Sequence, residues 1–160
     1  RLEPAVNRRT AVTTRELPSF GQLKSAEKAL IWGLIHTTGD ALEALAELDE
    51  SDLEGLAGRD ILEVARSLHE PPASFPAALL QRLSTVNAQL VSSIAADAIS
   101  PAPAAACARA LKRLRWERER AAIQREIDRL QELGATQHGQ EIDTLWLRKI
   151  NLLHRIEELT

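Results

Sequence analysis

The chain has 160 residues, of which 44% are hydrophobic and only 3% aromatic, and its formal net charge is −3. Alanine, leucine, glutamate and arginine dominate, and these residues favour helices because their side chains keep rotamer freedom on a helical backbone. Seven glycines and sparse β-branched runs exclude an all-β sandwich, which needs frequent turns and Val/Ile/Tyr-rich strands. The composition therefore predicts an all-α fold.

The single cysteine excludes an internal disulfide framework and a cysteine-based zinc site. No stretch of the sequence approaches the roughly 18 uncharged apolar residues of a membrane span. The chain opens at Arg1 with a polar run and has no signal-peptide pattern. We therefore expect a fragment of a larger protein, without membrane contact, in a reducing cytoplasm.

Charge is distributed unevenly along the chain. Residues 22–100 carry five basic and twelve acidic side chains, whereas residues 101–134 carry eight basic and five acidic ones. Phosphate binding requires positive charge clustered on one surface, which an acidic body with one mildly basic helix does not provide. Solvated helix faces are the simpler interpretation, and we expect no direct nucleic-acid binding.

The first elements predicted in chain order are a linker and the opening helix of a bundle. Residues 1–21 lack periodicity, are rich in Thr, Arg and Pro, and are typical of a linker. Ser25 is predicted to cap a helix that runs to about Thr38. Gly39 is expected to end this helix, and the spacing Asp40-x-x-Glu43 predicts a capping box for the next one.

Short helices continue through the rest of the bundle, which we place at residues 22–100. The capping pattern recurs at Ser51-x-x-Glu54 and at Asp60-x-x-Glu63, and the paired prolines after His69 stop the helix that follows the second box. Two more helices are predicted, over 75–83 and 86–99.

A longer element is predicted for residues 101–160. Ser100-Pro101 is a favourable helix start, and nothing after Pro103 breaks the helix before Gly134. Such a helix would be about 50 Å long at 1.5 Å per residue. A compact domain of about 100 residues has a radius of gyration near 13 Å, so the long helix is expected to protrude unless it bends.

A five-residue link, 135–139, joins the long helix to a second helix over 140–159, which predicts an antiparallel hairpin. Apolar residues at helical spacing mark one face of the outgoing helix: Trp116, Ile123, Ile127 and Leu130. One stripe of the returning helix is apolar: Ile142, Leu145, Leu152, Ile156 and Leu159. An adjoining stripe consists of Trp146, Ile150 and Leu153. Together the stripes cover an arc of about 180°, wider than the seam that one partner helix buries. A partner protein, the bundle or a second copy could cover the surplus.

No catalytic or metal-binding constellation is apparent. None of the four histidines pairs with another at helical spacing, and phosphate-loop, nucleophile-elbow and HExxH motifs are absent. Asp49, Glu50 and Asp52 are best explained as helix-capping residues, and Cys107 as a packing residue. Trp32 and Trp116 are most simply core residues. We therefore predict no catalytic residue, no metal and no cofactor.

Three stretches carry a resemblance to a known family. They are residues 25–36 (SAEKALIWGLIH), residues 53–62 (LEGLAGRDIL), and the run from Leu111 through Glu126-Ile127 to the helix over 145–159. In their order and pattern, residues 22–160 resemble the C-terminal, helicase-binding region of bacterial DNA primases of the DnaG type. The resemblance implies a helical bundle joined through a long helix to a helical hairpin.

The resemblance also implies a function. The hairpin would grip the N-terminal domains of the hexameric replicative helicase (DnaB type), and the bundle would stimulate that helicase, which couples RNA primer synthesis to DNA unwinding at the replication fork. The parent protein would be a DNA primase with a zinc-binding module and a metal-dependent catalytic core, and residues 1–21 would be the linker from that core. Neither set of metal ligands occurs here, so the fragment itself is expected to be no enzyme and to need no cofactor.

The expected contact residues come from the surplus apolar stripe. We predict Trp146, Ile150 and Leu153 as anchors, because tryptophan and large apolar residues concentrate at interface centres. Arg148, His154 and Glu157 are the predicted polar neighbours. The alternative is a helical scaffold or dimerisation domain that uses the same hairpin. An enzyme with a site between bundle helices lacks any supporting group of residues.

Overall fold

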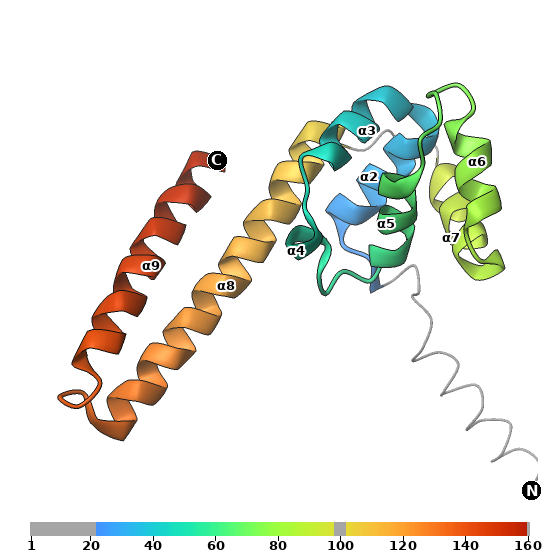
Figure 1. Ribbon diagram of the computed structural model, residues 1–160. Coiled ribbons are helices and arrows are strands. Elements are labelled where there is room, and N and C mark those ends of the chain that lie inside the picture. The colour runs from blue at the N-terminus through green and yellow to red at the C-terminus, as the bar shows by residue number, and fades with distance from the viewer. Residues whose placement is uncertain (1–21, 98–101, 160) are drawn as a thin grey trace, which may run out of the picture. The chain divides into compact units, whose positions relative to one another are not determined.

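The computed structural model describes residues 22–97 and 102–159, and within these ranges the chain contains helices and no strand (Figure 1). The helices are α2 (Ser25–His36), α3 (Thr38–Ala46), α4 (Glu50–Leu53), α5 (Arg59–Ser67), α6 (Phe75–Arg82), α7 (Thr85–Ala95), α8 (Ala104–Gly134) and α9 (Gly139–Leu159). The predicted all-α fold is confirmed. The predicted linker 1–21 and the predicted helix start at Ser100-Pro101 lie outside the described residues.

The chain divides into two compact units, the first ending at Ala108 and the second beginning at Arg109. The sequence-based boundary lay at 100/101. The first turn of α8 therefore belongs to unit 1, and the remainder of α8 forms unit 2 together with α9.

Unit 1 is organised around α2, which packs against α3, α6 and α7 (Figure 1). Leu30, Ile31 and Leu34 of α2 are fully buried. The other fully buried large side chains of this unit come from the surrounding helices and connections: Leu45, Leu48, Leu53, Ile61, Leu62, Phe75 and Leu79. Burial of aliphatic side chains at this density is the main stabilising contribution to a small helical unit.

A buried glutamate closes the start of α2. Glu27 is fully buried, and its two carboxylate oxygens accept hydrogen bonds from the backbone N–H groups of Lys24 (2.9 Å) and Gly58 (2.8 Å). Lys24 is the N-cap residue, so the prediction that Ser25 caps this helix is wrong by one position. The first turn of a helix leaves N–H groups without intrahelical partners, and here an acidic side chain from the same turn satisfies one of them.

The next helix boundaries also differ from the prediction. α2 ends at His36, and Gly39 lies inside α3 rather than between the two helices. Thr37 alone separates α2 from α3, and the Thr38 hydroxyl donates to the carbonyl oxygen of Leu34 at 2.9 Å. A one-residue connection leaves no room for the glycine turn that the sequence predicts.

The capping box of α4 is shifted by two residues. Asp49 and Asp52 exchange hydrogen bonds between side chain and backbone N–H, at 3.0 and 3.1 Å, so the predicted box Ser51-x-x-Glu54 is wrong. The interpretation of Asp49 and Asp52 as capping residues is confirmed.

The start of α5 and the end of α7 also differ from the predictions made from the sequence. The predicted box at Asp60-x-x-Glu63 is absent, because Glu63 instead accepts a hydrogen bond from Arg59 Nε at 2.7 Å. Ser84 caps α7 by accepting from Asn87 N at 3.2 Å. This helix ends at Ala95, short of the predicted end at residue 99.

Two aromatic side chains of α2 contact backbone carbonyl groups at the end of α7. Trp32 Nε1 donates to the carbonyl oxygen of Asp97 at 3.2 Å, and His36 Nε2 lies 2.7 Å from the carbonyl oxygen of Ala95. The two rings stack with their centroids 4.3 Å apart. The last carbonyls of a helix lack intrahelical partners, and the His36 ring provides a partner for the carbonyl of Ala95, the last residue of α7.

The start of α8 lies at Ala104, later than predicted. The Pro103 carbonyl accepts from Cys107 N at 3.1 Å, which places Pro103 just before the helix. Cys107 is buried, and its burial raises the pKa of the thiol. The interpretation of Cys107 as a packing residue is confirmed.

Candidate protein-docking surface

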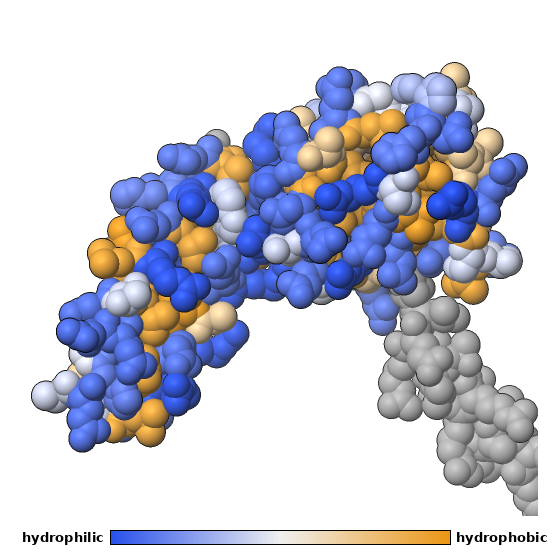
Figure 2. Space-filling view, viewed as in Figure 1, coloured by the Kyte–Doolittle hydropathy of each residue, from blue (hydrophilic) through white to orange (hydrophobic). Residues whose placement is uncertain are grey.

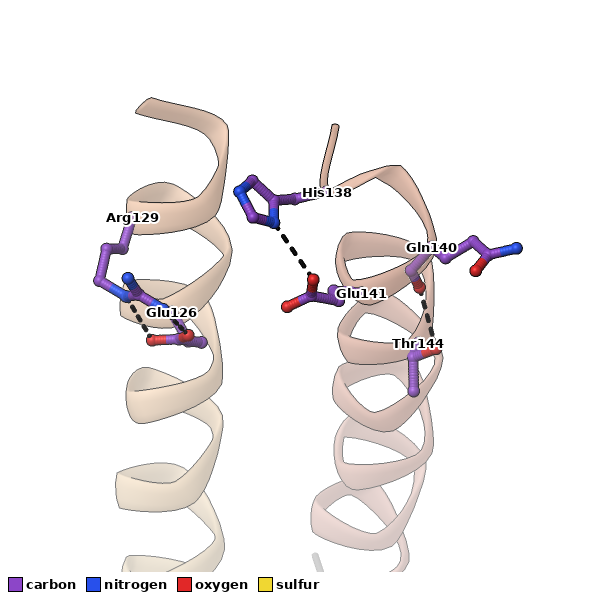
Figure 3. Close-up of polar contacts among 6 residues, drawn as sticks. All are labelled: Glu126, Arg129, His138, Gln140, Glu141 and Thr144. Atoms are coloured by element: carbon purple, nitrogen blue, oxygen red, sulfur yellow. Dashed lines mark hydrogen bonds and ion pairs between the residues drawn. The ribbon is translucent and has the colours of Figure 1, made fainter. Parts of the chain in front are cut away.

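The hairpin of unit 2 reverses at a glycine. Gly134 ends α8 with a φ of +140°, which residues with a side chain rarely adopt, and α9 begins at Gly139. Three polar contacts surround the turn (Figure 3). His138 Nδ1 lies 3.1 Å from Glu141 Oε1, the Thr144 hydroxyl donates to the Gln140 carbonyl at 3.0 Å, and Arg129 pairs with Glu126. Each contact joins residues three or four positions apart.

An apolar core joins the two hairpin helices. Ile123, Ile127 and Leu130 of α8 are buried together with Ile142 and Leu152 of α9. Trp116 and Leu145 are partly buried and pack against this cluster. All of these residues belong to the predicted apolar faces of the two helices. Ile156 is buried as well, as expected for the first stripe of α9.

Polar contacts also cross between α8 and α9. Lys149 Nζ donates to Gln124 Oε1 at 2.5 Å and lies 4.6 Å from the centroid of the Trp146 ring. An ammonium group over the face of an indole is attracted by the ring quadrupole. Lys149 thereby contacts both Trp146 of α9 and Gln124 of α8.

A second apolar face of α9 remains exposed. The exposed fractions are 39% for Trp146, 65% for Leu147 and 45% for Ile150, and Leu153 is half-buried. We name these four residues the α9 patch. Figure 2 shows apolar surface on the hairpin between hydrophilic side chains. Isolated exposed apolar residues are normal, whereas several on one helix face are typical of an interaction site.

The structure brings two of the three predicted polar neighbours to the patch. His154 and Glu157 are exposed and, at about 100° per residue, lie on the same side of α9 as Ile150. Arg148 lies on the other side of the buried stripe, where its Nη2 is 3.8 Å from Glu119 Oε1 of α8. Arg148 is therefore placed with the hairpin contacts and away from the patch.

Sequence reasoning missed two exposed leucines of the hairpin. Leu147 is the most exposed member of the patch, and Leu133 near the end of α8 is 57% exposed. The signal for Leu147 was present in the sequence, because Leu147 precedes Ile150 by three positions and so shares its face. Leu133 follows Leu130 by three residues, yet it is exposed, whereas Leu130 is buried.

Across residues 22–97 and 102–159, no group of three or more His, Cys, Asp or Glu side chains is arranged to hold a metal ion. None of the helices described is long and apolar enough to cross a membrane. No family model, curated protein or solved structure matches the chain in a comparison with known proteins.

Proposed function

We propose that the chain is the helicase-binding domain of a bacterial DNA primase. In this proposal the α9 patch docks on the N-terminal domains of the hexameric replicative helicase, and the helices of unit 1 stimulate the helicase. The observation that carries the proposal is the exposure of Trp146, Leu147 and Ile150 on a helix whose adjoining apolar stripe already packs against α8.

The composition of the patch suits a protein partner. Interface centres are enriched in tryptophan, are depleted of charged residues and are surrounded by a polar rim. Trp146 and Ile150 provide the centre, and the exposed side chains of His154 and Glu157 provide part of the rim. The Lys149 ammonium lies over the indole, and this attraction would lower the side-chain entropy that Trp146 loses on association.

The helicase is the proposed partner because residues 22–160 resemble the primase family in the order and pattern of their helices. The domain would couple primer synthesis to DNA unwinding in the cytoplasm, without polymerase activity, cofactor or nucleic-acid contacts of its own. The acidic character of residues 22–100 supports the proposal that this domain does not contact DNA, since the negative charge would repel DNA phosphates.

The experiment measures binding of the chain to a purified bacterial hexameric replicative helicase. Changing both Trp146 and Ile150 to alanine should weaken binding by about a hundredfold, because two central anchors are lost. Circular dichroism should be unchanged, since both side chains are exposed. A matched control changes the exposed apolar residues Val86 and Leu133 to alanine and should bind normally. Full binding by the Trp146/Ile150 variant would contradict the assignment of this surface.

The α9 patch also supports one alternative, a scaffold that dimerises through its hairpin. Light scattering separates the two functions, because a scaffold requires a dimer at micromolar concentration and the helicase-binding domain does not. A monomer at high concentration would contradict the scaffold, and a dimer that the Trp146/Ile150 change dissociates would favour it.

A further inference from the structure

Unit 1 contains a groove that the proposed function does not use. The groove has a volume of about 350 Å³ and is lined by residues of α2, α3 and the segment 102–105. Small residues line part of the groove, among them the buried residues Ala29, Gly33 and Ala44. Trp32 lines the groove as well. A volume of this size accommodates apolar side chains of a bound molecule.

Three carboxylates line the same groove. Asp40, Glu43 and Glu47 are all exposed and belong to α3 or its C-cap position. Their spacing of three and four residues places them on one face of the helix. Within the ranges 22–97 and 102–159, no Lys, Arg or His forms an ion pair with any of the three. The groove therefore combines apolar lining with uncompensated negative charge.

Local helix stability does not account for two of these carboxylates. Glu47 occupies the C-cap of α3, where the helix dipole is negative and an anion is unfavourable. Glu43 and Glu47 are four residues apart, a spacing at which like charges repel. Asp40, by contrast, lies in the first turn and is favoured there. A bound cation would relieve the repulsion at the C-terminal end of the helix.

We infer that this groove binds a short basic segment of a partner protein, in which an apolar side chain stands next to lysine or arginine residues. The apolar side chain would enter between Trp32 and the small residues, and the basic side chains would pair with Asp40, Glu43 and Glu47. A lone metal ion is a poorer occupant, because these carboxylates form no metal-binding group in the described part of the chain. The inference does not depend on the α9 patch or on the helicase.

The test uses the full ¹⁵N-labelled chain and three short synthetic peptides: one of lysine and leucine, one of lysine and glycine, and one of glutamate and leucine. The lysine–leucine peptide should shift the backbone amide signals of Gly33, Glu43 and Ala44, and the other two should not. Equal binding of the lysine–glycine peptide would overturn the inference, because it would reduce the effect to charge attraction.

Charge variants localise the binding. Neutralising the rim with Asp40→Asn, Glu43→Gln and Glu47→Gln should weaken lysine–leucine binding about tenfold, as expected for the loss of three exposed ion pairs. The matched control neutralises three exposed carboxylates that do not line the groove, Asp60, Glu132 and Glu158, and should keep its affinity. Equal weakening in both variants would overturn the inference, since only net charge would matter. Unchanged affinity of the rim variant would overturn it as well.

A size variant tests the apolar part of the groove. Ala105 is exposed and lines the groove, whereas Ala110 is exposed on the same helix and does not. Ala105→Leu should narrow the groove and weaken binding severalfold, and Ala110→Leu should not. Equal binding by both variants would overturn the inference. Shifts of the Gly33 and Ala44 signals on concentrating the chain without peptide would also overturn it, because the occupant would then be a second copy.

Discussion

The carboxylate of Glu27 accepts a hydrogen bond from the backbone N–H of Gly58, a residue 31 positions further along the chain, at 2.8 Å. The second oxygen of the same carboxylate accepts from Lys24 N. Gly58 allows this approach, because a Cβ at its position would lie 3.1 Å from Glu27 Oε1 and 3.0 Å from Leu23 Cδ2. One buried acidic side chain thus joins the start of α2 to the start of α5.

Glu27→Gln should destabilise unit 1 by about 1–3 kcal/mol, because an amide has one acceptor oxygen and leaves one buried N–H without a partner. Amide hydrogen exchange of the core residues Leu30 and Ile31 measures this change within unit 1. The control Glu70→Gln alters an exposed glutamate that contacts Ser74 and should leave exchange unchanged. Equal protection in both variants would contradict a stabilising role for the Glu27 hydrogen bonds.

The two glycines that flank the hairpin turn should respond differently to alanine. Gly134→Ala should destabilise the hairpin by about 1–3 kcal/mol, because the φ of +140° strains a residue with a Cβ. Gly139→Ala should be neutral or stabilising by up to about 1 kcal/mol, since its Cβ would meet no atom within 4 Å. Thermal unfolding followed by circular dichroism compares the two. A neutral Gly134→Ala would show that the turn can adopt another backbone conformation.

Isoleucines on the two sides of the hairpin should also differ. Ile127 is fully buried, so Ile127→Ala should cost about 2–5 kcal/mol of hairpin stability. Ile150→Ala should cost less than about 1 kcal/mol, because Ile150 lies in the exposed α9 patch. Amide exchange of Ile123 and Leu152 reports on the hairpin core. A large loss of protection in Ile150→Ala would contradict the placement of this residue outside the core.

The pair Glu126–Arg129 should give a pH-dependent signal. The side-chain hydrogen bond from Arg129 lowers the pKa of Glu126, and the charge of Arg129 acts in the same direction. Because the pKa is lowered, the stabilising effect is present above the ordinary pKa of glutamate and is lost as the pH falls through the lowered value. The pair is exposed, so the effect on stability is small.

Arg129→Gln should therefore raise the pKa of Glu126 towards its ordinary value, as measured by NMR titration of the side-chain carboxyl carbon. Arg125→Gln removes the same charge from an exposed neighbouring position and should shift this pKa much less. Similar shifts in both variants would indicate a general charge effect in place of the hydrogen bond.

The hairpin could be predicted from the sequence, because its burial repeats with the helical period. Ile123, Ile127 and Leu130 recur at spacings of three and four, and the residues they contact lie just across a short turn. The same helical spacing predicted that α9 carries more apolar residues than one partner helix can bury. The exposure of Leu147 could have been predicted too, had its three-residue spacing from Ile150 been considered.

Helix caps and the groove could not be predicted in the same way. Acidic and hydroxyl residues occur together at the start of α4, and only the folded backbone decides that Asp49 forms the cap in place of Ser51. The buried Glu27 depends on a partner 31 residues away, which local patterns do not reveal. The groove depends on packing between α2, α3 and residues 102–105, so its lining has no common sequence signature.

Gly33 has a further consequence for the groove. A methyl group added there would come within 3.3 Å of both Ala41 Cβ and Thr37 Oγ1, so the bare backbone lets α2 and α3 lie close together. Gly33 also lines the groove. A larger residue would make the groove shallower and push the two helices apart at the same time. Substitutions in the acidic rim can therefore change which basic segments the groove prefers. Substitutions that change the shape of the apolar lining would also destabilise the fold.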